Sequence, residues 1–116
     1  MQSKKYHNIK TEYNGKIYDS RKEAKRAYEL DMLQRAGFIC NLIRQRTFEL
    51  QPPFKNNQGK LEPAITYVAD FFYFDKKKQC WIVEDVKSKI TKTLPVYRIK
   101  KKMLEYRYPN ILFRES

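Results

Sequence analysis

The chain has 116 residues, of which 41% are hydrophobic and 33% are charged, and this length and composition predict one folded domain over residues 1–116. Two cysteines without a CxxC pair and a single histidine argue against a zinc site, and no apolar run is long enough to cross a membrane. The formal net charge of +12 favours a polyanionic partner such as nucleic acid.

The N-terminal part is predicted to form a hairpin followed by a helix. Residues 1–10 are polar and are expected to be loose. An Asn-Gly pair predicts a tight turn in a hairpin over residues 11–18. Ser20 and Glu23 have the spacing of a capping box, which predicts a helix over residues 21–36 that a glycine ends.

Runs of β-branched and aromatic residues predict four strands after this helix. A short strand is expected over residues 47–51 and is followed by two prolines and a polar turn. Strands over residues 64–74 and 79–87 are expected to pair through a lysine-rich turn, and the last strand covers residues 111–113.

A second helix is predicted over residues 95–107, because a proline suits its first turn. Its expected apolar stripe, which should face the sheet, consists of Val96, Ile99, Met103 and Tyr106. Lys100 falls inside this face, whereas Lys101 and Lys102 are expected to point outward. Lys100 then either extends to solvent or reaches the functional cleft and contacts a phosphate. Tyr97 is a second candidate for such a contact.

The predicted order is helix, three strands, helix, strand. The middle strands form a hairpin, and the second helix crosses back to place the last strand in the same sheet. The sequence therefore predicts an α/β domain with a mixed four-stranded sheet flanked by helices, preceded by a small hairpin.

Three acidic residues stand on core elements of this basic chain. Asp70 lies inside a largely apolar strand, where its ionised side chain needs a cation, a metal ion or a strand end to offset desolvation. Asp85 and Lys87 are two apart on the next strand, so they share a face, either as a surface ion pair or as a metal ligand beside a cation. Glu23 is explained by its capping role, although its helical face also carries apolar residues.

Taken together, these residues indicate metal-assisted chemistry on a phosphate. Glu23, Asp70 and Asp85 offer the oxygen ligands that Mg²⁺ prefers, with Mn²⁺ as a substitute. Lys87 is placed to hold a water molecule or to contact the phosphate oxygens. A metal ion between the carboxylates and the phosphate would offset their repulsion.

These residues resemble the PD-(D/E)XK signature of restriction-endonuclease-like nucleases. Asp70 and the segment Asp85-Val86-Lys87 match its core, and Glu23 matches the acid that these enzymes often carry on their first core helix. Ala69 stands where the nominal motif has proline. More closely, the chain is similar to a family of small phage and prophage proteins of unknown function grouped with these nucleases.

This resemblance implies an αβββαβ core and a Mg²⁺-dependent DNA endonuclease in the cytoplasm of a phage or prophage host, and it does not fix the DNA substrate. Because nothing in the sequence resembles a module that reads bases, action on branched or junction DNA is a further hypothesis. The resemblance implies catalytic roles for Glu23, Asp70, Asp85 and Lys87. DNA contacts are expected from Lys89, Lys92, Lys100 and Tyr97. The alternatives are a DNA-binding module without catalysis, or an inhibitor or adaptor of a host nucleic-acid enzyme. A homodimer is a further hypothesis.

Overall fold

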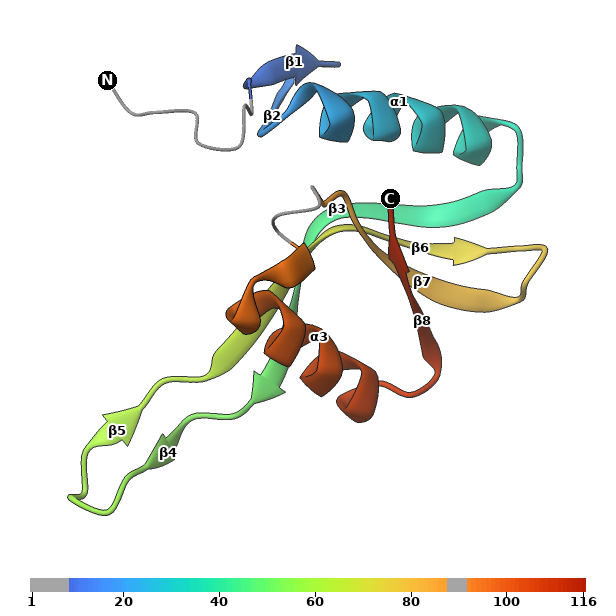
Figure 1. Ribbon diagram of the computed structural model, residues 1–116. Coiled ribbons are helices and arrows are strands. Elements are labelled where there is room, and N and C mark those ends of the chain that lie inside the picture. The colour runs from blue at the N-terminus through green and yellow to red at the C-terminus, as the bar shows by residue number, and fades with distance from the viewer. Residues whose placement is uncertain (1–8, 88–91) are drawn as a thin grey trace.

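Two helices and a mixed four-stranded sheet form the body of the protein in the computed structural model, which describes residues 9–87 and 92–116 (Figure 1). The elements in chain order are β1 (Thr11–Tyr13), β2 (Lys16–Tyr18), α1 (Arg21–Arg35), β3 (Ile39–Gln51), β4 (Phe54–Lys55), β5 (Leu61–Glu62), β6 (Ile65–Asp75), β7 (Cys80–Asp85), α3 (Pro95–Arg107) and β8 (Ile111–Glu115). None of the helices in the described part of the chain has the length and apolar character needed to cross a membrane.

The sheet has the strand order β3-β6-β7-β8, and its core elements follow the predicted order αβββαβ. β6 pairs antiparallel with β3 and β7, whereas β8 pairs parallel with β7. α1 and the β1–β2 hairpin pack on one face, and α3 packs on the other (Figure 1). The predicted fold class is therefore confirmed.

Local sequence signals account for the hairpin and α1. Asn14 and Gly15 both have positive φ, at 52° and 78°, as a type I′ turn requires. The Ser20 side chain accepts a hydrogen bond from the Glu23 amide and so caps α1. Gly37, with φ of 87°, follows the helix end.

β3 is much longer than predicted, since it covers 13 residues rather than residues 47–51 alone. Its first half escaped prediction because it does not alternate regularly. Asn41 and Gln45 have φ of 57° and 58°, and the pairing with β6 shifts between Cys40 and Ile43. Pairing with a full-length neighbour, rather than local propensity, keeps this segment extended.

The regular alternation of β3 side chains between the two faces of the sheet is interrupted at Gln45, which has a positive φ. On β3, the Arg44 guanidinium lies over the Tyr18 ring on the α1 side, whereas Arg46 lies over Phe48 and Phe72 on the α3 side. Regular alternation would place these two arginines on the same face. On β6 the same change occurs around Asp70, because Ala69 packs with α3 whereas Phe71 packs with α1. Asp70 therefore does not share one face with its neighbours at every second position, as regular alternation along β6 would require.

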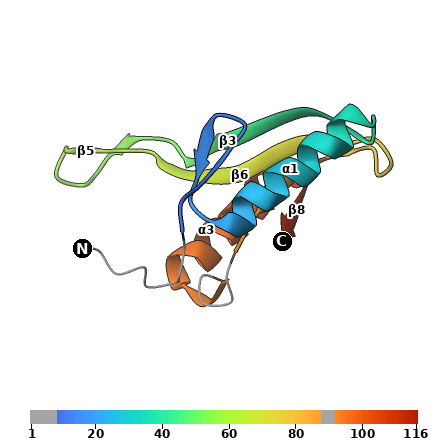
Figure 2. The ribbon, with the colours of Figure 1, turned by 90° about the horizontal axis from the view of Figure 1, so that it is seen from above.

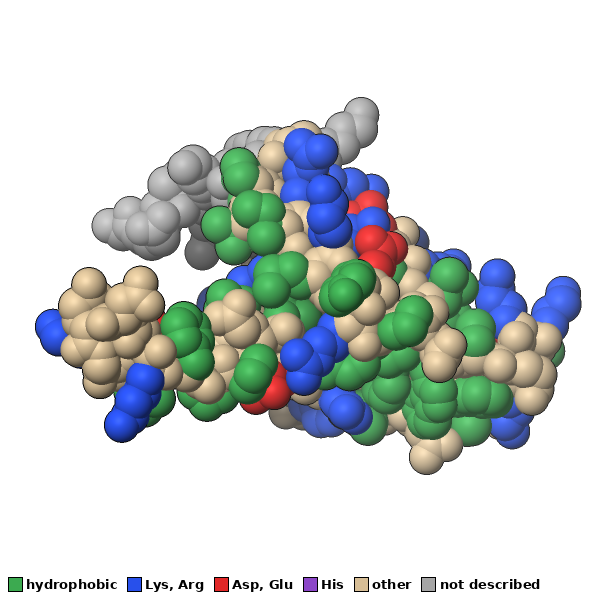
Figure 3. All heavy atoms as spheres, turned by 90° about the horizontal axis from the view of Figure 1, so that it is seen from below, with side chains coloured by type: hydrophobic (Ala, Val, Ile, Leu, Met, Phe, Trp, Pro, Cys, Tyr) green, Lys and Arg blue, Asp and Glu red, His purple; other side chains and the backbone are tan. Residues whose placement is uncertain are grey.

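The predicted apolar stripe of α3 is correct at Met103, which packs against the core on this side of the sheet, and wrong at its other three positions. Val96, Ile99 and Tyr106 are 66%, 58% and 88% exposed, whereas Tyr97 and Leu104 are buried. Two turns separate Tyr97 from Leu104, so they lie on one face, and the helix is rotated to bury the tyrosine. Lys101, expected to point outward, lies with its Nζ 5.0 Å from the centre of the Phe113 ring. On this side of the molecule, Figure 3 shows Lys and Arg side chains among hydrophobic ones.

A two-stranded arm, formed by β4, β5 and their turn, extends away from the sheet (Figure 2). No residue from 51 to 65 is buried. Asn56 organises the tip, where its side-chain oxygen accepts hydrogen bonds from the amides of Gln58 and Lys60. The polar turn was predicted, but the short strands that carry it were not.

Candidate active site

Asp70 and Asp85 meet where β6 and β7 separate. The ladder between these strands reaches Phe71 and Glu84, and the next pair of residues is Asp70 and Asp85. There the Asp70 amide donates a hydrogen bond to Asp85 Oδ1 at 3.1 Å, and the Val86 amide donates one to Asp70 Oδ2 at 2.8 Å. Each carboxylate thus accepts from the backbone of the opposite strand, which keeps both side chains at the fork.

Asp85 is fully buried and only partly satisfied. Its Oδ2 atom has no hydrogen-bond partner among the described residues. Burial raises the pKa of this carboxyl to about 6, against the opposing effects of Lys87 and the Asp70 amide. Burial also raises the pKa of Asp70, which retains partial exposure to solvent. The pair is therefore costly to keep ionised without an additional cation.

Lys87 brings a cation to the fork, as its sequence position predicted. β7 ends at Asp85, so Lys87 lies just beyond the strand rather than inside it. Its Nζ atom is 3.7 Å from Asp85 Oδ1 and 5.1 Å from the centre of the Tyr97 ring. The Lys87 backbone is held as well, because its amide donates to the Ser116 carbonyl and its carbonyl accepts from Lys22 Nζ.

Tyr97 is buried beneath the Lys87 amine. Burial raises the Tyr97 pKa, and so does the hydrogen bond that its hydroxyl donates to the Glu115 carboxylate. Because the ring faces Lys87 and the hydroxyl is engaged, the arrangement favours support of the lysine over a direct phosphate contact. The DNA contact predicted for Tyr97 remains untested.

Glu23 is 5% exposed and points into the protein from the first turn of α1. Its carboxylate accepts a long hydrogen bond of 3.4 Å from Gln45 Nε2. Burial and the negative charge of Asp70 raise the Glu23 pKa to about 7. The Glu23 amide therefore donates to the Ser20 cap, whereas its carboxylate points inward and lies close enough to Asp70 for the charge of Asp70 to raise its pKa.

A buried ion pair beside the site was not anticipated. Glu84, fully buried next to Asp85, accepts hydrogen bonds from Arg26 Nε at 2.5 Å and Nη2 at 3.1 Å, and from the Tyr73 hydroxyl at 2.5 Å. These donors lower the Glu84 pKa despite burial. Strand alternation sends Glu84 and Asp85 to opposite faces, so that only Asp85 reaches the fork. The sequence feature that could have predicted this ion pair is Arg26, a cation on the side of α1 that faces the sheet.

The predicted basic residues occupy several environments. Lys92 is exposed and lines a groove with Tyr97, Arg98 and other residues of α3. Lys100 is half-buried, and its phosphate contact stays a prediction. Lys89 lies outside the described residues, as does the N-terminal segment before residue 9.

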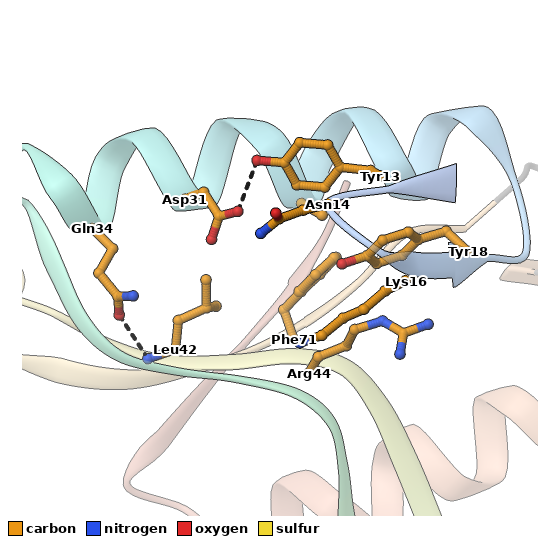
Figure 4. Close-up of a pocket in the computed structure, with 10 residues that line it drawn as sticks. Tyr13, Asn14, Lys16, Tyr18, Asp31, Gln34, Leu42, Arg44 and Phe71 are labelled. Atoms are coloured by element: carbon orange, nitrogen blue, oxygen red, sulfur yellow. Dashed lines mark hydrogen bonds between the residues drawn. The ribbon is translucent and has the colours of Figure 1, made fainter. Parts of the chain in front are cut away.

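A separate small pocket lies between the hairpin, α1 and β3 and does not include the fork (Figure 4). The Tyr13 hydroxyl donates to Asp31 at its rim, and the Arg44 guanidinium donates to the Ile17 carbonyl. The buried Nε of Arg44 has no hydrogen-bond partner among the described residues. The two hydrogen bonds at this pocket join the hairpin to α1 and to β3.

The fork suits a hard divalent cation. The unpartnered Asp85 oxygen and the adjacent Asp70 carboxylate provide oxygen donors, and Mg²⁺ is commonly held by one or two carboxylates with water completing its shell. Within residues 9–87 and 92–116, no three Asp, Glu, His or Cys side chains are grouped closely enough to hold a metal ion. Direct coordination by Glu23 therefore stays a prediction.

Comparison with known proteins identifies one family. A family model described as a protein of unknown function, DUF1064, matches residues 3–114. Neither a search of curated proteins nor a search of solved structures found a match. The matching region includes both helices and all four residues that the sequence singled out as catalytic.

Proposed function

The chain belongs to the DUF1064 family of proteins of unknown function, and we propose that it is a metal-dependent nuclease that hydrolyses phosphodiester bonds in DNA. The observation that carries this proposal is the meeting of two carboxylates and one amine at the β6–β7 fork. The αβββαβ order of core elements and the net charge of +12 support it. Membership of the PD-(D/E)XK superfamily is part of the proposal.

In the proposed reaction, the water oxygen forms a bond to phosphorus as the bond from phosphorus to the leaving oxygen breaks. The attacking water loses its proton to solvent, and the leaving oxygen takes up a proton from solvent. Asp70 and Asp85 would hold Mg²⁺ or Mn²⁺, which when bound supplies charge neutralisation at the phosphate and a lowered pKa for water. The Lys87 amine is positioned to donate to the water or to the phosphate oxygens as negative charge develops. Tyr97 and Asp85 limit the positions that this amine can occupy.

The proposal is tested by cleavage assays on linear duplex, single-stranded and branched DNA with Mg²⁺, with Mn²⁺ and with EDTA. We expect metal-dependent cleavage by the wild type. Asp70→Asn and Lys87→Met should lose at least about 100-fold in rate and still bind DNA, because the first removes an anionic ligand of the proposed metal ion and the second removes the amine that acts on the reacting phosphate.

The matched controls are Glu62→Gln and Lys78→Met, which make the same chemical changes on the arm and in the β6–β7 turn. Both should cut like the wild type. Complete inactivity of the wild type on every substrate and metal would instead favour a binding module or an inhibitor. Equal activity of the Asp70 variant and the wild type would remove Asp70 from the site.

A further inference from the structure

We propose that a basic groove on the α1 face binds DNA phosphates next to the one that is cut, an inference that rests on the proposed nuclease function. The groove has a volume of about 220 Å³ and lies between α1, the end of β7 and the end of β8. Its cations come from α1 and β8 and are Lys22, Lys25, Arg26 and Arg114. The DNA contacts favoured from the sequence lie instead on α3 and in the segment before it.

Three of these cations are free to take an anion. Arg26 is engaged by the buried Glu84 and by Glu29, with Nη1 3.1 Å from the Glu29 carboxylate. By contrast, Lys22, Lys25 and Arg114 are exposed and form no ion pair with any described residue. Glu29 also lines the groove but is paired with Arg26, so an approaching phosphate would meet three cations that no described carboxylate neutralises.

The groove adjoins the candidate active site through two contacts. Lys22 Nζ donates to the carbonyl of Lys87 at 3.1 Å, so the cation is anchored beside the proposed catalytic lysine. Val86, whose amide donates to Asp70, also lines the groove. A phosphate in the groove would thus lie next to the β6–β7 fork on its α1 side.

A second basic groove reaches the same fork from the other face of the sheet. Tyr97, whose ring faces Lys87, lines it together with the cations Lys92, Arg98, Lys101 and Lys102. Two carboxylates also line it, and both are engaged, because Glu105 pairs with Lys101 and Glu115 accepts from the Tyr97 hydroxyl. A polyanion with evenly spaced charges can contact both grooves and the fork at once, whereas a single small anion cannot. A DNA backbone crossing from the α1 face to the α3 face fits this distribution of charge.

The test is DNA binding in EDTA, which separates affinity from cleavage. Fluorescence anisotropy with a labelled duplex is measured over a series of salt concentrations for the wild type and for the triple variant Lys22→Ala/Lys25→Ala/Arg114→Ala. The control triple variant Lys55→Ala/Lys60→Ala/Lys78→Ala removes the same charge from the arm and the β6–β7 turn. Thermal melting verifies that all three proteins are folded.

We expect the groove variant to bind DNA roughly tenfold or more weakly than the control. The slope of log binding constant against log salt concentration should become less steep by about 0.9 for each lost phosphate contact. Equal binding by the two triple variants would overturn the groove and leave the nuclease proposal standing. Selective loss of binding in a protein that cuts no substrate would support the groove while the nuclease proposal fails. If the groove variant does not fold, Lys25→Glu and Arg114→Glu are measured singly against Lys60→Glu, with the same two outcomes.

Discussion

At the scale of single residues, the site consists of groups that the fold satisfies only in part. Glu84 receives three hydrogen bonds, two of them from the Arg26 guanidinium, whereas its neighbour Asp85 keeps one oxygen without a partner among the described residues. Glu23 is buried with one long hydrogen bond. Buried carboxylates with too few hydrogen bonds, such as Asp85 and Glu23, have raised pKa values and destabilise the folded state when they ionise.

Glu23 should therefore make stability depend on pH. Its pKa is about 7 in the folded protein against 4.5 in the unfolded chain, so the folded state binds the proton more tightly. Stability should fall as pH rises from about 4.5 to about 7, by up to about 3 kcal/mol. Urea unfolding in EDTA should accordingly show Glu23→Gln to be more stable than the wild type at about pH 8 and little different at about pH 4.5. Glu12→Gln, an exposed control, should show no such change, and a pH-independent effect of Glu23→Gln would contradict the explanation.

At the scale of elements, the structure separates what local sequence determines from what packing determines. The β1–β2 turn, the Ser20 cap and the bounds of α3 follow from short-range signals and were predictable. The length of β3 and the rotation of α3 were not, because pairing with β6 and burial of Tyr97 decide them. For the same reason, hydrophobic periodicity identified the helix but selected the wrong face.

The observed rotation of α3 predicts unequal effects of two similar truncations. Leu104→Ala removes a side chain that is 2% exposed and should lower the free energy of unfolding by about 2–4 kcal/mol. Ile99→Ala removes one that is 58% exposed and should cost less than about 0.5 kcal/mol. Urea unfolding of both variants measures the difference. Similar costs would restore the stripe expected from the sequence.

At the scale of the whole molecule, the sheet brings together residues that are distant in the chain, while the arm extends away from it. Asp70 and Asp85 were predictable as a pair because adjacent antiparallel strands carry them. The contributions of Tyr97, Glu115 and Ser116 were not, since they depend on where α3 and β8 return to the sheet. The radius of gyration is 16.2 Å, against about 13 Å for a compact domain of this length, and the unburied arm contributes to the excess.

The arm should be dispensable for folding. Replacing residues 52–64 with Asn-Gly joins Gln51 to Ile65, which already pair, and removes no buried side chain. We expect the free energy of unfolding to change by less than about 1 kcal/mol and the radius of gyration to fall towards about 13 Å. Urea unfolding and small-angle X-ray scattering measure the two quantities. Failure of the shortened chain to fold would assign the arm a structural role that its exposure does not indicate.

The unsatisfied oxygen of Asp85 also links ion supply to the lifetime of the folded chain. In the proposed enzyme, a cation that binds the fork relieves the same electrostatic penalty that weakens the metal-free protein. A ligand present at about 100 times its dissociation constant adds about 2.7 kcal/mol to the stability of the state that it binds. A low concentration of divalent ions would thus reduce both the activity and the folding stability of the protein, and both effects would act through the Asp85 carboxylate.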